Sequence, residues 1–420
     1  MKEKVIMIGV DFGKRDFDIK AAMKELGELV EAAEGQVIAQ LTQKIDSVNA
    51  RLFIGKGKAE ELAELVEELE ADTVVINEEL SGTQLRNLEE LIGCKIIDRT
   101  NLILDIFATR ATTLEGKLQV QLAQMKYRLP RIIGYSDYLS KLGGGIGTRG
   151  PGESQLETDR RHVMREIRLV EDKLFRAKDN RHVTRKRREK SSLPLVSLLG
   201  YTNAGKSTLM NAILNTNPQN DEVKEVFVKD MLFATLDTAH RSTKFKSGAS
   251  FLISDTVGFV SKLPTALVNA FEGTLDEIRY ADLILHVVDL SNPNLDLQME
   301  TTAQLLKSMD VNTPILTVFN KIDRVEMELV DTLVSEYDEK VFISALDPSD
   351  VSMLLNKVES MLNEHFVLAE FLVPFDDLAV LDIFMKNYEV QNLEYNDQGA
   401  QFKASVSHED ASRYARFIIS

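Results

Sequence analysis

The chain has 420 residues, 44% of them hydrophobic and 28% charged, which is typical of a globular protein with about two to four domains. Its 50 Lys and Arg residues against 66 Asp and Glu residues give a net charge of −16, which excludes a uniformly basic nucleic-acid-binding surface. The single cysteine, Cys94, excludes a disulfide framework and a cysteine-based zinc cluster, and no run approaches the 18 or so apolar residues of a membrane span. We therefore expect a cytoplasmic protein in which Cys94 is a small buried residue.

Residues 1–112 predict an α/β domain with a parallel sheet. Short β-branched runs at 5–10, 37–40, 74–76 and 95–97 are typical of strands, and 58–70 and 82–92 of helices. The first of these helices opens with Gly55-Lys56-Gly57-Lys58. This stretch is explained equally well by phosphate binding, with a second nucleotide such as ATP as one candidate, and by a tight turn between a strand and a helix.

Residues 113–192 predict a helical hairpin. Apolar residues recur at helical spacing from 114 to 129 and again from 156 to 174, and six glycines lie between these helices within residues 143–152. We expect this glycine-rich segment to be a mobile loop at the tip of the hairpin. The second helix continues into a basic run that ends before Leu193-Pro194, a candidate domain boundary.

Basic residues are concentrated in the second hairpin helix. Residues 160–190 hold 13 Lys and Arg against 5 Asp and Glu, a local charge of +8, so the rest of the chain carries −24. A solvated helix face would explain this run in many proteins, but beside a glycine-rich loop in an acidic protein we expect contact with RNA. The residues expected to contact RNA are Arg149, Arg160, Arg161, Arg165, Arg168, Arg185, Lys186, Arg187 and Arg188.

Residues 193–365 predict a second α/β domain. The runs LVSLL, FLISD, LILHVVD, PILTVF and VFIS have the length and composition of buried parallel strands, with helical segments between them. Residues 366–420 predict a small α+β domain in the order strand, helix, strand, strand, helix.

The second α/β domain contains a phosphate-binding motif. Gly200-Tyr-Thr-Asn-Ala-Gly-Lys206-Ser207 matches G-x-x-x-x-G-K-[ST] and lies between the strand LVSLL and a predicted helix at 207–214. In this motif backbone N–H groups surround the β-phosphate, the lysine contacts the β- and γ-phosphates, and the serine hydroxyl ligates Mg²⁺. The sequence therefore predicts a P-loop domain.

Three shorter motifs follow in the order of a GTP-binding domain. Asp255-Thr-Val-Gly258 follows FLISD, where a carboxylate can hold Mg²⁺ through water and a glycine N–H can contact the γ-phosphate. Asn320-Lys-Ile-Asp323 follows PILTVF, and its aspartate can accept both N1–H and N2–H of guanine, donors that adenine lacks. Ser344-Ala-Leu346 follows VFI, where a backbone N–H can meet guanine O6.

These motifs, together with the stretch GTRGPGESQLETDRR at 147–161, FATLD at 233–237 and DTVGF at 255–259, resemble the translation-factor-like GTPases. More narrowly, nearly the whole chain resembles the HflX family of ribosome-associated GTPases. The resemblance implies a GTPase that uses Mg²⁺, binds the 50S large subunit with its hairpin directed towards the peptidyl transferase centre, and acts in splitting or rescue of stalled ribosomes, especially under stress, or in large-subunit biogenesis. It also assigns the switch threonine to Thr235, whereas spacing alone leaves Thr238 and Thr243 as candidates.

The expected catalytic residues are Lys206, Thr235 and Gly258, and the expected Mg²⁺ ligands are Ser207 and Thr235, with Asp255 acting through water. Phe259 stands where many GTPases have a water-orienting glutamine, so we expect slow intrinsic hydrolysis that ribosomes stimulate. The residues expected to contact GTP are Gly200, Tyr201, Thr202, Asn203, Ala204, Gly205, Lys206, Ser207, Thr208, Phe233, Ala234, Thr235, Leu236, Asp237, Asp255, Thr256, Val257, Gly258, Asn320, Lys321, Asp323, Ser344, Ala345 and Leu346.

Three other functions fit parts of the sequence. A tRNA-modifying GTPase would share the nucleotide motifs, but it would need a catalytic group such as a cysteine, and the lone Cys94 lies far from the GTP-binding motifs in the sequence. RNA remodelling would instead depend on a second nucleotide, such as ATP, bound at Gly55–Lys58. A GTP-regulated protein scaffold would explain Phe259 and leave the basic hairpin without a purpose. The sequence has no dimerisation signature, so we expect a monomer.

Overall fold

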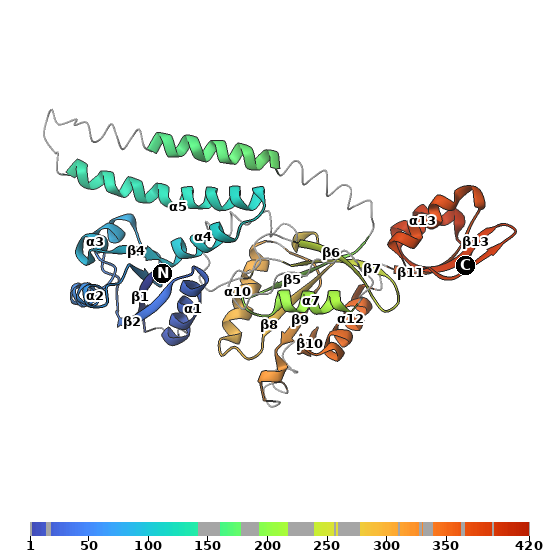
Figure 1. Ribbon diagram of the computed structural model, residues 1–420, viewed down its shortest axis with the longest axis horizontal. Helices are drawn as coiled ribbons and strands as arrows, with labels where there is room; N and C mark the ends of the chain where they lie inside the picture. The colour runs from blue at the N-terminus through green and yellow to red at the C-terminus, as the bar shows by residue number, and fades with distance from the viewer. Residues whose placement is uncertain are drawn as a thin grey trace. The chain divides into compact units, whose positions relative to one another are not determined.

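The computed structural model describes residues 2–13, 18–141, 160–177, 193–216, 239–255, 258, 278–309, 311–326, 330, 339–362, 366–388 and 390–419. The chain divides into two compact units, one containing residues 1–179 and the other most of the remainder. Each unit is built around its own sheet or sheets (Figure 1).

The first unit contains a four-stranded parallel sheet in the order β2-β1-β3-β4. Its helices α2 and α3 pack on one face through Leu62, Val66 and Leu88, and α1 and α4 lie on the other side (Figure 1). The expected parallel α/β architecture is confirmed. The bounds are β1 (Lys4–Asp11), α1 (Ile19–Ala32), β2 (Gln36–Lys44), α2 (Lys56–Leu69), β3 (Thr73–Ile76), α3 (Gly82–Ile92), β4 (Lys95–Asp98) and α4 (Arg99–Arg110).

The start of α2 has the geometry of a turn between a strand and a helix. Gly55 is the N-cap, and its N–H donates to Gln43 Oε1 at 3.0 Å. The two lysines pair within their own helix, Lys56 with Glu60 at 3.2 Å and Lys58 with Glu61 at 2.7 Å. These local contacts account for the glycines and lysines at the start of α2 without a ligand.

The hairpin consists of α5 (Leu114–Lys141) and a second helix over residues 160–177. Leu118 and Leu122 pack against Ile167 and Val170, and Lys126 forms a 2.7 Å ion pair with Glu171. The expected apolar faces therefore meet. The glycine-rich segment and the basic run after residue 177 lie outside the described residues.

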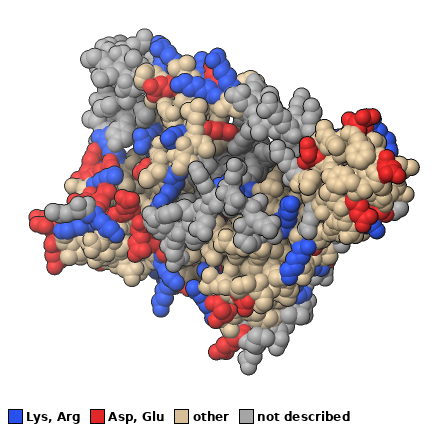
Figure 2. Space-filling view, turned by 45° about the vertical axis from the view of Figure 1, so that its right-hand side comes forward, with Lys and Arg blue, Asp and Glu red and all other residues tan. Residues whose placement is uncertain are grey.

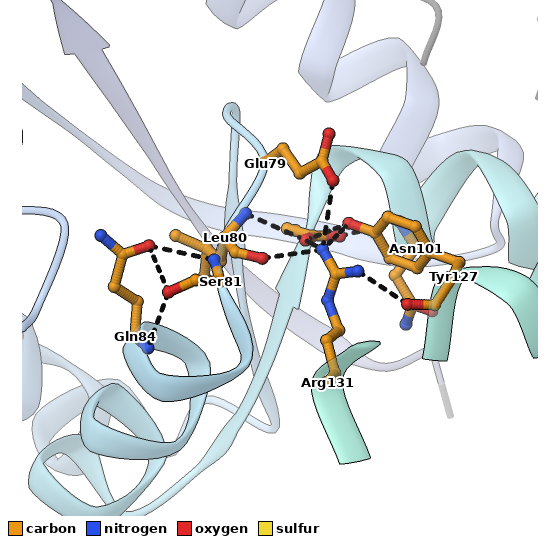
Figure 3. Close-up of polar contacts among 8 residues, drawn as sticks. Glu79, Leu80, Ser81, Gln84, Asn101, Tyr127 and Arg131 are labelled. Carbon is orange, nitrogen blue, oxygen red and sulfur yellow. Dashed lines mark hydrogen bonds and ion pairs between the residues drawn. The ribbon is translucent and has the colours of Figure 1, made fainter. Parts of the chain in front are cut away.

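A buried polar cluster joins α5 to the sheet (Figure 3). The Asp98 carboxylate, 2% exposed at the end of β4, accepts from the Tyr127 hydroxyl, from Leu80 N at 3.1 Å and from Arg131 Nη2 at 3.1 Å. The guanidinium of Arg131 also donates to Leu80 O at 2.7 Å and lies 3.4 Å from the centre of the Tyr127 ring. Burial and the Asp98 charge hold the pKa of Tyr127 above its ordinary range, so its phenol stays protonated and donates.

The second unit contains a six-stranded sheet in the order β10-β9-β8-β5-β7-β6, parallel except for β6, and a three-stranded antiparallel sheet in the order β11-β13-β12. Helices α7 and α12 cover one face of the larger sheet through Met210, Ile213 and Leu354 (Figure 1). The bounds in the larger sheet domain are β5 (Leu195–Gly200), α7 (Lys206–Asn215), β6 (Ala239–Lys244), β7 (Ser250–Asp255), β8 (Leu283–Asp289), α10 (Leu295–Ser308), β9 (Ile315–Asn320), η1 (Ile322–Arg324), β10 (Lys340–Ile343) and α12 (Pro348–Leu362).

The C-terminal part of the second unit has the expected order of elements. In its core Phe371 and Phe402 of the small sheet stack on one another, and Phe384 of α13 packs against both at steep ring angles. The bounds are β11 (Phe366–Val373), α13 (Leu378–Asn387), β12 (Gln391–Asn396), β13 (Gly399–Ser407) and α14 (His408–Arg413), with the short helices η3 (Phe375–Asp377) and η4 (Ala415–Phe417).

Among the described residues, no helix is both long enough and apolar enough to cross a membrane.

Cys94 is only half-buried, which corrects the expectation of a buried cysteine: it follows the C-cap glycine of α3 at the rim of the core. Its partial burial raises the pKa of the thiol and keeps it protonated.

Candidate nucleotide-binding site

The loop between β5 and α7 requires glycine at both ends. Gly200 has φ +150°, and a Cβ there would lie 2.0 Å from Val287 O. Gly205 has φ +92°, and a Cβ there would lie 2.3 Å from Asn320 Nδ2. Asn203 between them also has a positive φ, 61°. The loop thus turns tightly enough to direct backbone N–H groups towards a bound phosphate at the start of α7.

Lys206 is the first residue of α7 and is buried within this loop. Its Nζ donates to Gly200 O at 3.0 Å and to Tyr201 O at 2.8 Å. Burial lowers the pKa of Lys206 to about 8, and the nearby Asp255 carboxylate opposes that shift. A cation held at the mouth of the loop is suited to binding phosphate oxygens.

Ser207 and Asp255 bring two oxygen ligands together. Ser207 Oγ donates to Asp255 Oδ2 at 2.7 Å, and Asp255 is fully buried at the end of β7. Hydroxyl and carboxylate oxygens are the ligands that Mg²⁺ prefers, so this pair fits a nucleotide-bound Mg²⁺.

Gly258 lies against the same loop. A Cβ added to Gly258 would be 2.7 Å from Thr202 Cγ2 and 2.9 Å from Lys206 Nζ. The structure therefore gathers Thr202, Lys206, Ser207, Asp255 and Gly258 at one end of the site, where the motifs place the terminal phosphate and its metal ion.

Asn320 connects the two ends of the site. Its Nδ2 donates to Ala204 O at 2.8 Å in the phosphate loop, and its Oδ1 accepts from Ala345 N at 2.9 Å. Lys321, with φ +65°, donates from Nζ to Asn203 O at 2.8 Å and to Asp289 Oδ2 at 2.8 Å. These bonds hold the loops after β5, β9 and β10 at a fixed separation.

The expected guanine-binding residues lie at the open end of the site. Asp323 is exposed on η1, with Arg324 Nε 3.8 Å from its carboxylate. Ser344 N donates to Asp350 Oδ2 at 2.7 Å, and Leu346 is 72% exposed. A carboxylate accessible beside a backbone turn can accept hydrogen bonds from a base.

Three residues around the site were not predicted from the sequence. Asp289 fixes Lys321, and Asp350 fixes the turn at Ser344. His286 is 5% exposed on β8, where burial and then the Lys206 charge lower its pKa to about 4. Asp289 alone had a recognisable signal, because it is a carboxylate at the carboxyl end of a central strand.

The remaining expected site residues lie either in the first part of the site or outside the described part of the chain. Tyr201 and Ala204 are buried in the phosphate loop and Thr208 is half-buried in the first turn of α7. Seven expected nucleotide contacts lie outside the described part of the chain, namely Phe233, Ala234, Thr235, Leu236, Asp237, Thr256 and Val257. Phe259 lies outside it as well.

Four of the expected RNA-contacting residues, Arg160, Arg161, Arg165 and Arg168, are exposed on the helix over 160–177, whose other face packs on α5. On the face of the molecule in Figure 2, both basic and acidic side chains are present. The other expected contacts lie outside the described residues, namely Arg149, Arg185, Lys186, Arg187 and Arg188.

Three protein-family models match the chain. A model described as GTP-binding GTPase N-terminal matches residues 20–108, and one described as GTP-binding GTPase Middle Region matches 110–188. A third, described as 50S ribosome-binding GTPase, matches residues 195–321, which include the phosphate loop and Lys321.

Similar proteins cover the chain from end to end. A GTPase HflX of Caldanaerobacter subterraneus subsp. tengcongensis is 43% identical over 420 residues, which is 100% of this chain and 94% of that protein. The GTPase HflX of Escherichia coli strain K12 is 38% identical over 364 residues, 86% of this chain and 83% of that protein. A solved structure of a GTP-binding protein from Sulfolobus solfataricus in complex with GDP covers 87% of this chain and 99% of its own, at 23% identity and a TM-score of 0.46.

Proposed function

Because the chain belongs to the GTPase HflX family, we propose that it is a GTP-hydrolysing switch that binds the 50S large ribosomal subunit. Its biological role would be splitting or rescue of stalled ribosomes, or large-subunit biogenesis. It would act as a monomer in the cytoplasm, where its ribosomal partner is found.

The observation that carries the GTP assignment is the bonding of Asn320 to both Ala204 O and Ala345 N. One amide side chain thereby sets the distance between the phosphate loop and the turn that would meet guanine. Asp323, three residues along the chain, would accept from N1–H and N2–H of guanine, and adenine would leave this carboxylate without a partner. We therefore propose GTP as the substrate.

Mg²⁺ would be held by Ser207 and Thr235, with Asp255 acting through water, and it would neutralise charge on the β- and γ-phosphates. In GTP hydrolysis Lys206 would contact the phosphates, and the Gly258 N–H would contact the γ-phosphate. Because phenylalanine at 259 has no hydrogen-bonding group, we expect the isolated protein to hydrolyse GTP slowly and the ribosome to accelerate it.

The hairpin would be the RNA-binding element. Its two helices pack through their apolar faces, which leaves Arg160, Arg165 and Arg168 exposed for ribosomal RNA phosphates. The domains would be an N-terminal α/β domain at 1–112, the hairpin at 113–192, the GTP-binding domain at 193–365 and a small C-terminal domain at 366–420.

Co-sedimentation with purified 50S, 30S and 70S particles tests this proposal. The protein would be added with a non-hydrolysable GTP analogue, with GDP or without nucleotide. We expect analogue-dependent binding to 50S particles, and loss of the 70S peak would favour splitting over biogenesis. Absence of binding in every nucleotide state would contradict the ribosomal role and leave the GTPase assignment intact.

A further inference from the structure

We infer that Thr202 is a catalytic residue, whose hydroxyl hydrogen-bonds the γ-phosphate of GTP and the water that attacks it. The inference rests on the proposed GTP hydrolysis and assigns part of that reaction to a side chain of the phosphate loop. In the reaction the water oxygen forms a bond to the γ-phosphorus, and the bond from that phosphorus to the β–γ bridging oxygen breaks. GDP leaves, one proton of the water stays on the oxygen that forms the new bond, and the other passes to another oxygen of the inorganic phosphate.

The first observation is the state of the Thr202 hydroxyl. Thr202 is 6% exposed, and within the described part of the chain its buried Oγ1 has no hydrogen-bond partner. A buried hydroxyl without a partner destabilises a protein, so such a group in a binding loop is best explained by a partner that arrives with the ligand.

The second observation is where Thr202 lies. Its Cγ2 and Cα are 2.7 and 2.9 Å from the position that a Cβ on Gly258 would occupy, and Lys206 Nζ is 2.9 Å from the same position. Thr202 and Lys206 therefore both lie against Gly258, which the motif places at the γ-phosphate. Ser207, the residue after Lys206, bonds to Asp255 at 2.7 Å, and the motifs assign this pair to Mg²⁺.

The third observation is the side chain that is missing. A glutamine after D-x-x-G orients the attacking water in many GTPases, and here that residue is Phe259. A threonine hydroxyl has one donor and two acceptor lone pairs, so it can donate to a phosphate oxygen and accept from the water. Thr202 thus offers chemistry that Phe259 lacks.

Thr202→Val tests the inference because it replaces the hydroxyl with a methyl group of similar size. Single-turnover hydrolysis with 50S particles would fall by about 10- to 100-fold, the effect of one lost hydrogen bond to a charged group. GDP affinity would stay within about twofold, because GDP has no γ-phosphate. Thr202→Ser, which restores the hydroxyl, would recover the rate to within about threefold of the unmodified protein.

Thr302→Val is the matched control. Thr302 is fully buried on α10 of the same domain, and its hydroxyl donates to Gln298 O at 2.9 Å. This variant would lose a buried hydroxyl and keep its hydrolysis rate. Equal rates in Thr202→Val and the unmodified protein, or equal losses of rate and GDP affinity, would overturn the inference. No hydrolysis by the unmodified protein would instead contradict the proposed GTPase function.

Discussion

The Ser207 hydroxyl donates a 2.7 Å hydrogen bond to Asp255 Oδ2, and this bond joins the first turn of α7 to the end of β7. The two residues are 48 positions apart in the sequence. A Mg²⁺ ion arriving with the nucleotide would take the hydroxyl oxygen as a ligand and would reach the carboxylate through water, so the bond between the two side chains would be exchanged for bonds to the metal.

Ser207→Ala removes this hydroxyl. We expect Mg²⁺ to raise the GTP affinity of the unmodified protein. In the variant this rise in affinity should be smaller by a factor of about ten or more, which is the effect of one lost ligand or charged hydrogen bond. Nucleotide titrations with Mg²⁺ and with a chelator measure the difference. Ser207→Thr, which keeps the oxygen, should behave as the unmodified protein; an alanine variant with full Mg²⁺ dependence would rule out the serine as a ligand.

The lowered pKa of Lys206, about 8, predicts that GTP binding depends on pH. The free protein loses the lysine proton above pH 8, whereas a bound phosphate holds the ammonium form, so binding above that pH takes up a proton. Affinity should therefore fall as pH rises, by about fourfold between pH 7 and pH 8.5.

Calorimetry in two buffers of different ionisation enthalpy measures that proton uptake directly. We expect uptake at pH 8.5 and almost none at pH 6.5. Lys206→Arg stays charged across this range and should show no such dependence, while Lys206→Ala should lose tight binding altogether. Tight GTP binding by the alanine variant would remove the proposed phosphate role of the lysine.

Asp323→Asn should weaken GTP binding by about 10- to 150-fold, because a carboxylate that accepts two hydrogen bonds is replaced by an amide that must place a donor group near the base. The same variant should gain affinity for xanthosine triphosphate, whose C2 oxygen accepts where guanine donates. Competition between the two nucleotides, in both proteins, measures the change in preference. An unchanged preference would place guanine recognition elsewhere.

Arg131→Ala should destabilise the first unit by about 3 kcal/mol, because the buried Asp98 carboxylate would lose its cation. Thermal unfolding of the full chain with saturating GDP measures this effect. GDP raises the unfolding temperature of the nucleotide-binding domain and so separates its transition from that of the first unit. Glu79→Ala is the control: Glu79 is 59% exposed at 3.5 Å from Arg131, and we expect a change below about 1 kcal/mol.

The paired substitution Arg165→Ala and Arg168→Ala should weaken 50S binding and reduce its salt dependence. Each lost phosphate contact lowers the slope of log affinity against log salt by about one. Sedimentation at several salt concentrations gives the slope. Lys117→Ala, at an exposed basic residue of α5, is the control for the loss of a single surface charge. A loss of affinity per removed charge equal to that of the arginine pair would argue against a specific RNA contact by the arginines.

The strands that carry the nucleotide site could be predicted because each is a continuous apolar run that ends in a polar motif. Strand β6 (Ala239–Lys244) could not, because its sequence AHRSTK contains no apolar run: it pairs antiparallel with β7 at the edge of the sheet. Helix α4 was missed for the opposite reason. Leu102, Ile103, Leu104, Ile106 and Phe107 are all buried, so the helix has no single apolar face to recognise.

Helix α1 (Ile19–Ala32) was also not predicted, although its sequence has a recognisable helical pattern. Met23, Leu26, Leu29 and Val30 are buried at helical spacing, and Asp18 caps the first turn. The bonds that complete the site could not be predicted, because Lys321 reaches Asp289 and Asn320 reaches Ala345 only once separate strands are placed side by side. Motifs identify the ends of the strands, and the sheet brings them together.

The two hydrogen bonds of the Asn320 amide have a thermodynamic consequence. Because one side chain holds both the phosphate loop and the turn at Ala345, a displacement of either loop must be transmitted to the other. Binding of guanine and binding of the phosphates are then reciprocally coupled: the factor by which the bound base raises phosphate affinity equals the factor by which the bound phosphates raise the affinity for the base. A partner that moves the phosphate loop would therefore release the nucleotide from both ends at once.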